Sequence, residues 1–305
     1  MHLRKILQVF IIVTGLFFLG PGCSVIEQGA GVLSKTGRIS ESDRQAVVET
    51  SKAFRRTFAD ITEEEEYFIG RAVAALILSK YGIYPDRDLT LYVNKVGNAV
   101  VFYSERPEIY DGYHFLILDT EEVNALSAPG GFVFITKGLL RRCRDEEMLA
   151  CILAHEVGHI SAKHGLRSIK NSRLIDAFQI MGQEAMRRYT SAELSRLTGI
   201  FEDVLADITE SLVERGYDRK YEYEADSLAV TCAVGTGYNP QGLLDFLQTM
   251  VENPEKGQGA GWFRTHPRAE DRIKRISRQV SKLKSLPVKD DIRSRRFLQV
   301  AGSLK

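Results

Sequence analysis

The stretch His155-Glu156-Val157-Gly158-His159 lies in the middle of a chain of 305 residues and forms an H-E-x-x-H pattern. Histidines four residues apart lie one turn above each other on a helix, so both rings can bind one zinc ion. Glu156 lies beside them, where its carboxylate can take a proton from an attacking water without binding the metal. The preceding turns are apolar and predict a buried helix; they contain Met148, Leu149, Ile152 and Leu153.

A catalytic zinc site keeps three protein ligands and one open position, so the pattern requires a third ligand. We predict Glu222, which lies in the helical stretch Tyr221-Glu222-Tyr223-Glu224-Ala225-Asp226. Asp226 shares a face with Glu222 at one-turn spacing and can accept the free N–H of a ligating histidine. Glu224 points elsewhere and is expected to be solvated. One zinc ion per chain is therefore expected.

The rest of the sequence predicts a predominantly helical protein with a small β-sheet beside the metal helix, in the α+β class. Apolar residues at helical spacing, or helix stop signals, predict helices at 61–81, 92–103, 219–234 and 240–250. Two β-type runs, 113–118 and 131–136, lie on either side of a Pro-Gly-Gly turn. The charged region 166–214 predicts one or two helices over the cleft.

The net charge and the N-terminal sequence indicate which partners and which cellular location to expect. The 41 Lys and Arg residues nearly cancel the 40 Asp and Glu residues, so no nucleic-acid partner is indicated. A basic start followed by an uncharged apolar run predicts a signal peptide at 1–22, because the run is shorter than the roughly 20 residues of a spanning helix. Cys23 follows small residues and predicts a lipid anchor; an uncleaved anchor or plain secretion are the alternatives.

The chain resembles the HtpX-like and CAAX prenyl protease-like zinc metallopeptidases, particularly their exported bacterial members. The resemblance covers nearly the whole mature chain. It rests on Asn124-Ala125 before Pro129-Gly130-Gly131, Gly138-Leu139-Leu140, the motif from His155 to His159, Glu222 with Ala225-Asp226, and His266-Pro267 with Arg272-Ile273. The resemblance implies a zincin-like metallopeptidase fold.

The same resemblance implies roles for individual residues. Zinc is expected on His155, His159 and Glu222, with Glu156 as the base. An edge strand at Asn124 and Ala125 is expected to receive extended substrate.

Two later residues, His266 and Arg272, are placed in the cleft by the resemblance. His266 can stabilise the oxyanion, or it can fill the fourth zinc position and block the enzyme; as a loop residue it would be satisfied by backbone. Arg272 can supply charge to the oxyanion, or pair with Asp226 or Asp271. His164 lies about 140° around the helix from the second motif histidine and is not expected to bind zinc.

The function implied is that of a zinc metalloendopeptidase hydrolysing internal bonds of unfolded or misfolded envelope proteins. It would act in the periplasm, anchored to the outer membrane through Cys23. The alternative is a chaperone-like assembly factor for outer-membrane proteins that rarely cleaves. A purely structural zinc site is disfavoured, because it would have four closed ligands and no use for Glu156. Long apolar segments are lacking, so processing of prenylated proteins is not expected. A helical-repeat domain after the peptidase is not expected either, because the sequence leaves no room for one.

These features predict four segments along the chain. They are a signal peptide at 1–22, a lipidated N-terminus and flexible tether at 23–43, a zinc metallopeptidase domain at 44–285, and a basic, irregular tail at 286–305. The cysteines besides Cys23 are Cys143, Cys151 and Cys232, and buried thiols are expected there rather than a disulfide.

Overall fold

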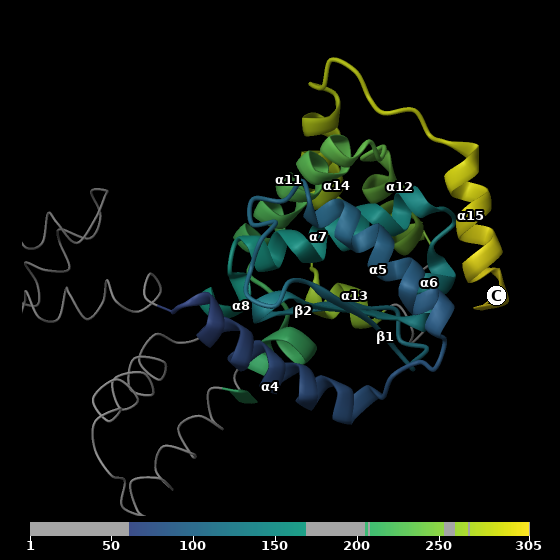
Figure 1. Cartoon of the computed structure of the whole chain (residues 1–305). Helices are drawn as coiled ribbons and strands as arrows, with labels where there is room; N and C mark the ends of the chain where they lie inside the picture. Colours follow the sequence, from purple (N-terminus) through teal and green to yellow (C-terminus); the bar gives the residue numbers. More distant parts are fainter. Residues whose placement is uncertain (1–60, 169–204, 207, 253–259, 268, 305) are drawn as a thin grey trace, which may run out of the picture. The chain divides into compact units, whose positions relative to one another are not determined.

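Helix α7 (Glu146–Ser161) carries the H-E-x-x-H motif, and all of its residues are buried. Asp145 caps the helix by accepting a hydrogen bond from the backbone N–H of Met148 at 2.9 Å. The computed structural model describes residues 61–168, 205–206, 208–252, 260–267 and 269–304 (Figure 1). Within these residues, α7 packs against neighbouring helices and two of the three strands. The prediction of a buried motif helix is confirmed.

The sheet has three strands in the order β1 (His114–Leu118), β3 (Phe132–Thr136) and β2 (Ala125–Ala128). Strand β3 is parallel to β1 and antiparallel to β2, to which the short turn η1 (Pro129–Gly131) joins it. Strand β2 is therefore an edge strand. Periodicity alone does not mark β2, because its four residues are all buried and do not alternate. The family resemblance implies it.

The remaining described helices surround this centre (Figure 1). Those expected from the sequence are α4 (Glu63–Tyr81), α5 (Arg87–Val101), α11 (Arg219–Thr236) and α12 (Gln241–Glu252). The others are α6 (Lys137–Arg142), α8 (His164–Arg167), η2 (Ser211–Arg215), α13 (Ala260–Thr265) and α14 (Ala269–Val280). The segments expected at 1–43, and most of the helical region expected at 166–214, lie outside the described residues. No helix of the described part is both long and apolar enough to cross a membrane.

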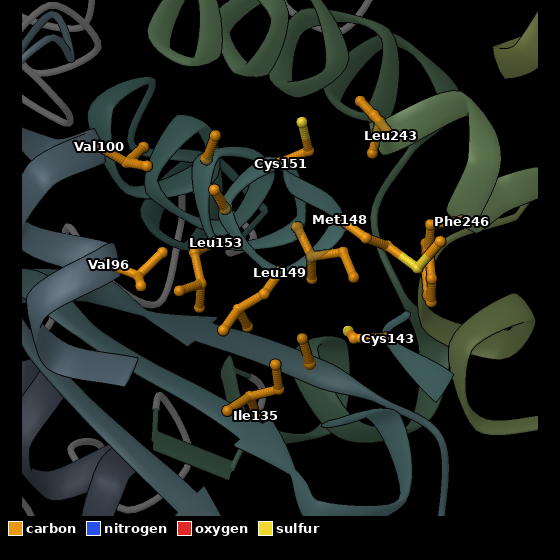
Figure 2. Close-up of a cluster of buried hydrophobic side chains, with 14 of the residues drawn as sticks. Val96, Val100, Ile135, Cys143, Met148, Leu149, Cys151, Leu153, Leu243 and Phe246 are labelled. Atoms are coloured by element: carbon orange, nitrogen blue, oxygen red, sulfur yellow. The ribbon is translucent and has the colours of Figure 1, made fainter. Parts of the chain in front are cut away.

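A hydrophobic core fixes the position of α7 (Figure 2). Leu149 and Leu153 of the helix meet Val96 and Val100 of α5 and Ile135 of β3, and all five side chains are buried. Each fully buried aliphatic side chain contributes about 1.5–3 kcal/mol. The motif is thus held by packing on several sides. Cys143, Cys151 and Cys232 are buried thiols and form no disulfide with one another, as expected.

The C-terminal segment corrects one expectation. An irregular, solvated tail at 286–305 is wrong, because Asp291–Ala301 forms helix α15, which ends in the short turn η3 (Gly302–Leu304). Asp290 caps the helix, and α15 packs on α5 and α7. Phe297 is the buried apolar anchor that basic composition concealed.

Arginines of α15 neutralise buried carboxylates at the start of α7. Arg293 lies 3.0 Å from Glu147, and the Arg296 Nε donates to Glu146 at 2.7 Å. Glu146 also accepts from the hydroxyls of Tyr92 and Tyr238, both at 2.7 Å. Burial opposes ionisation, but Arg296 and the two hydroxyls outweigh it and hold the pKa of Glu146 below its ordinary value.

We expect Glu146→Gln to lower the free energy of unfolding by about 1–3 kcal/mol at pH 7, since a charge-assisted buried network is broken. The depressed pKa means that the carboxylate's contribution is present above about pH 4.5 and lost as pH falls further. The difference between wild type and variant should therefore shrink towards pH 3. Urea unfolding at both pH values measures it, with exposed Glu252→Gln as the control. A difference independent of pH would contradict the assignment.

Candidate metal centre

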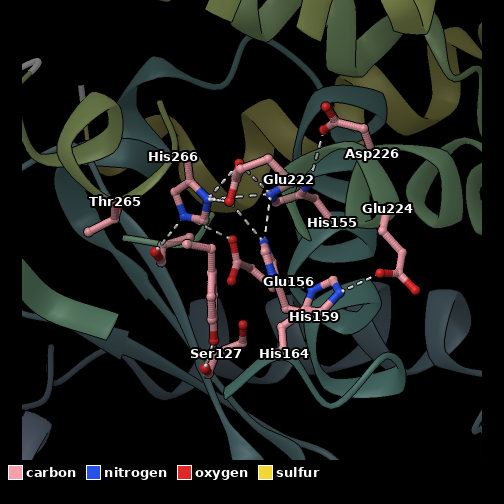
Figure 3. A network of polar contacts seen from close by, with 12 residues as sticks. Ser127, His155, Glu156, His159, His164, Glu222, Glu224, Asp226, Thr265 and His266 are labelled. Carbon is pink, nitrogen blue, oxygen red and sulfur yellow. Dashed lines mark hydrogen bonds and ion pairs between the residues drawn. The ribbon is translucent and has the colours of Figure 1, made fainter. Parts of the chain in front are cut away.

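Four buried side chains converge beside the middle of α7 (Figure 3). They are His155 and His159 of α7, Glu222 of α11 and His266, which follows α13. Each offers one nitrogen or oxygen atom, and these atoms all lie within 4.8 Å of one another. The structure thus brings together the three predicted ligands and one further candidate.

The spacing of these atoms fits a zinc ion. The Nε2 atoms of His155 and His159 are 3.1 Å apart, and the Glu222 carboxylate lies 3.6 Å and 3.4 Å from them. Ligand atoms at 2.0–2.1 Å from a tetrahedral zinc are about 3.3 Å apart. Two imidazoles and one carboxylate are also a donor set that zinc accepts.

A close approach of two helices makes this arrangement possible. Gly158 lies against α11, where an added Cβ would stand 3.1 Å from the Ala225 carbonyl oxygen. A larger residue at this point of the motif would push α11 away. Glycine therefore lets Glu222 and Asp226 reach the histidines.

Asp226 and Arg272 support the ligands from behind. The Asp226 carboxylate lies 3.0 Å from His155 Nδ1, which directs Nε2 of that ring to the centre. Arg272 donates to Asp226 through two bonds of 2.9 and 2.8 Å, and its Nη1 lies 2.9 Å from Glu222. Of the alternatives for Arg272, the structure shows pairing with Asp226, extended to Glu222.

Burial and neighbouring charges shift the pKa values of the candidate ligands. Burial alone would raise the pKa of Glu222, but His266, Arg272 and the other histidines outweigh it, so the pKa falls well below its ordinary value. Burial and Arg272 disfavour the charged ring of His155, yet Asp226 and Glu222 raise its pKa to about 9. Burial lowers the pKa of His159 well below its ordinary value. The third ligand position thus carries a negative charge at neutral pH.

Glu156 is buried at the centre, and neither of its carboxylate oxygens has a hydrogen-bond partner among the described residues. Buried polar atoms without partners are rare in proteins and call for an explanation. His266 Nε2 is 3.5 Å from one of these oxygens. The unpaired carboxylate of Glu156, next to the four candidate metal ligands, is therefore suited to accept a proton from a reactant.

His266 faces both the cluster and the sheet. Its Nδ1 lies 3.4 Å from His155 Nε2 and 3.2 Å from Glu222, while its Nε2 lies 3.3 Å from the Ala125 carbonyl oxygen. Its ring stacks on Trp262 with a centroid distance of 4.2 Å. These contacts exclude the interpretation of His266 as a loop residue satisfied by backbone alone.

The edge strand β2 lies beside the centre. Asn124 accepts from the backbone of Thr136 on β3, so the next residue, Ala125, turns its backbone groups away from β3. Its carbonyl faces His266, and its N–H is bonded to the Asn124 side chain at 3.0 Å. The outer edge of the strand thus opens toward the four donors.

Sequence reasoning missed Tyr217, which is buried against the metal centre. Its ring stacks on His159 at 4.2 Å, and its hydroxyl donates to the Ser127 carbonyl at 3.4 Å. Gly216, with φ 72°, allows this placement, because an added Cβ would stand 2.2 Å from the Thr265 carbonyl oxygen. A lone tyrosine before a helix gives no sequence signal of such a role.

His164 and Glu224 form a contact that was not expected from the sequence. Helix α7 ends at Ser161, so the position of His164 cannot be calculated by continuing that helix. The His164 ring contacts His159, but it does not belong to the group of four donors. Burial lowers the pKa of His164 to about 4, so the ring is neutral. Glu224 is exposed, as expected, and its carboxylate in addition accepts from His164 at 3.1 Å.

A motif helix with two histidines, a carboxylate on a second helix and an adjoining edge strand define a site of the H-E-x-x-H metallopeptidase class. The chain matches the model of peptidase family M48 over residues 89–280 and belongs to that family of zinc-dependent metallopeptidases.

Individual relatives are similar at low identity. The beta-barrel assembly-enhancing protease of Yersinia pestis is 22% identical over 75% of this chain and 46% of its own length. The mitochondrial metalloendopeptidase OMA1 of Schizosaccharomyces pombe is 26% identical over 73% of this chain and 63% of its own length. Metalloprotease LoiP of Escherichia coli is 23% identical over 92% of this chain and 98% of its own length. The chain thus spans about half the length of the first relative, somewhat less than two thirds of the second and nearly all of the third.

Proposed function

We propose that this chain is a zinc-dependent endopeptidase whose metal is held by His155, His159 and Glu222. The observation that carries the proposal is the buried donor set at zinc-compatible spacing, with the free carboxylate of Glu156 beside it. Membership of family M48 supports it.

Different residues of the chain have different roles in hydrolysis. Bound at this site, zinc supplies Lewis-acid polarisation of the scissile carbonyl. Glu156 takes a proton from the attacking water and passes it to the leaving amine. Asp226 and Arg272 hold the ligands in place, and Arg272 also keeps the centre from accumulating uncompensated negative charge.

Extended substrate adds as a further strand along β2, contacting the outward backbone carbonyl of Ala125, while the Asn124 side chain holds the Ala125 N–H. Main-chain hydrogen bonds then give affinity with little selection among side chains. In the described structure His266 lies against the Ala125 carbonyl, so a substrate strand must displace it. We propose that His266 is the cap that blocks the fourth zinc position in the resting enzyme.

The substrates we propose are unfolded or misfolded envelope proteins, cleaved in the periplasm as part of quality control. The name of the Yersinia relative, a beta-barrel assembly-enhancing protease, supports this setting. We propose further that 1–22 is a signal peptide, that lipid on Cys23 anchors the tether 23–43 to the outer membrane, and that the peptidase domain begins near residue 44.

A chaperone-like assembly factor for outer-membrane proteins is the second candidate function. The resting position of His266 among the donors favours it, since a capped centre cleaves rarely.

Zinc analysis with a cleavage assay tests the main proposal. The purified full chain should hold one zinc ion and cleave an unfolded protein; a chelator should stop cleavage and added zinc restore it. Glu222→Ala should lower zinc affinity by at least about 100-fold, because one of three ligands is lost. Exposed Glu252→Ala is the control. Unchanged zinc content in Glu222→Ala would contradict the ligand assignment.

A further inference from the structure

We propose that His164 and Glu224 form a hydrogen-bonded relay that positions His159 as a zinc ligand. The inference rests on the proposed zinc site and adds to it two residues that hold the ligand without touching the metal.

The relay is continuous from the donor cluster to the protein surface (Figure 3). His159 Nε2 faces the cluster, and its Nδ1 lies 2.9 Å from His164 Nδ1. The other ring nitrogen of His164 lies 3.1 Å from Glu224. Glu224 is about half exposed, with 45% of its side chain accessible, whereas both histidines are fully buried.

Only one assignment of protons satisfies all three contacts. A zinc ligand must present a lone pair, so His159 Nε2 is unprotonated and its Nδ1 carries the hydrogen. That N–H donates to His164 Nδ1, which therefore accepts. The hydrogen of His164 is then on Nε2 and donates to the Glu224 carboxylate. Each group has a partner, and the ligating tautomer of His159 follows from the position of the carboxylate.

The backbone is shaped to make this contact. After α7, Lys163 adopts the left-handed conformation, with φ 55° and ψ 34°, which is uncommon for a residue other than glycine. This turn starts α8 and brings His164 back to the side of His159. The Lys163 ammonium lies 3.3 Å from the buried Glu66 carboxylate. The ring of His164 stacks on Tyr221 at 4.5 Å.

The two motif histidines are thus supported in parallel ways. Asp226 contacts Nδ1 of His155 directly, and Arg272 holds that carboxylate. Among the described residues, no carboxylate contacts Nδ1 of His159, which reaches Glu224 through the ring of His164. Arg167 contacts Glu224 at 3.2 Å and takes the place that Arg272 has in the other arm.

Two substitutions of His164 separate positioning from packing. His164→Asn keeps an acceptor close to the place of Nδ1 but fills less space. His164→Phe keeps the ring and its stacking but removes the acceptor, leaving the His159 N–H unsatisfied and its orientation unfixed. A positioning role predicts tighter zinc binding by the Asn variant, and a packing role predicts tighter binding by the Phe variant.

The measurement is the zinc dissociation constant of the full chain by chelator competition, together with the melting temperature of each variant with and without zinc. We expect His164→Phe to weaken zinc binding by about 10- to 100-fold and His164→Asn to recover most of that loss. Glu224→Ala should weaken binding by about tenfold, at the low end of this range because water can replace the exposed carboxylate. Glu252→Ala, at an exposed glutamate on α12, is the matched control for Glu224→Ala and should change binding little.

The outcomes distinguish this inference from the proposal on which it rests. Wild-type protein that binds no zinc would overturn the zinc site itself. Zinc binding by wild type with no loss in His164→Phe, or with the Asn variant weaker than the Phe variant, would overturn the relay alone. Should His164→Phe fail to fold, Glu224→Ala decides: unchanged zinc affinity in that variant overturns the relay.

Discussion

Glu156→Gln is expected to lower peptide turnover by about 10²- to 10⁴-fold while zinc content stays near one ion per chain. The amide cannot take the proton of the attacking water, but the substitution removes none of the three proposed ligands. The side chain has no hydrogen-bond partner among the described residues, so its replacement breaks no described hydrogen bond. Turnover of a fluorogenic unfolded protein, with metal analysis of the same sample, measures both quantities. Glu64→Gln, on an exposed residue of α4, is the matched control.

The same variant distinguishes the two candidate functions in cells. A protease requires the base, so Glu156→Gln should fail to correct an envelope defect caused by loss of the wild-type chain. A chaperone requires only the cleft, so the variant should still correct it. Normal turnover by Glu156→Gln would remove the catalytic assignment of this residue altogether.

His266→Ala is expected to raise peptidase activity by about 10- to 100-fold, as follows if the uncapped form makes up about 1–10% of the resting enzyme. Removing the ring frees the fourth position and the outward carbonyl of Ala125 together, and zinc content should not fall, because His155, His159 and Glu222 remain. His114→Ala, on a histidine outside the cluster, is the control. Initial rates at equal zinc loading are the measurement.

A fall in the activity of His266→Ala would assign a different role to this residue. A group that stabilises the oxyanion contributes about 10²–10³ in turnover, so a fall of that size would make His266 a participant in the reaction instead of a cap. An unchanged rate would show that the contacts of His266 with Glu222 and Ala125 have no part in function.

The motif helix and its ligands could be predicted because their chemistry is local. The four-residue spacing of the motif places His155 and His159 on one face of a helix, with Glu156 beside them. The same spacing places Glu222 and Asp226 on one face of a second helix. The centre forms from only these two helices and the loop of His266. Binary pattern and turn residues likewise predicted β1 and β3.

Other features could not be predicted because they depend on where the chain turns. His164 was projected as if α7 continued, whereas the helix ends at Ser161 and Lys163 reverses the direction. Strand β2 has no alternation, since both of its faces are buried. The arginines of α15 looked like solvated charge because their partners, the carboxylates of α7, lie about 150 residues earlier in the chain.

The docking of α15 has a consequence for the order in which the molecule is assembled. Glu146 and Glu147 lie in the first turn of the motif helix α7. The arginines that neutralise them come from α15, the last α-helix among the described residues. During synthesis, the helix that carries the hydrolytic residues therefore lacks these arginine partners until residues 293 and 296 have been made. A chain that has not yet reached Arg296 therefore carries Glu146 and Glu147 without these two charge partners.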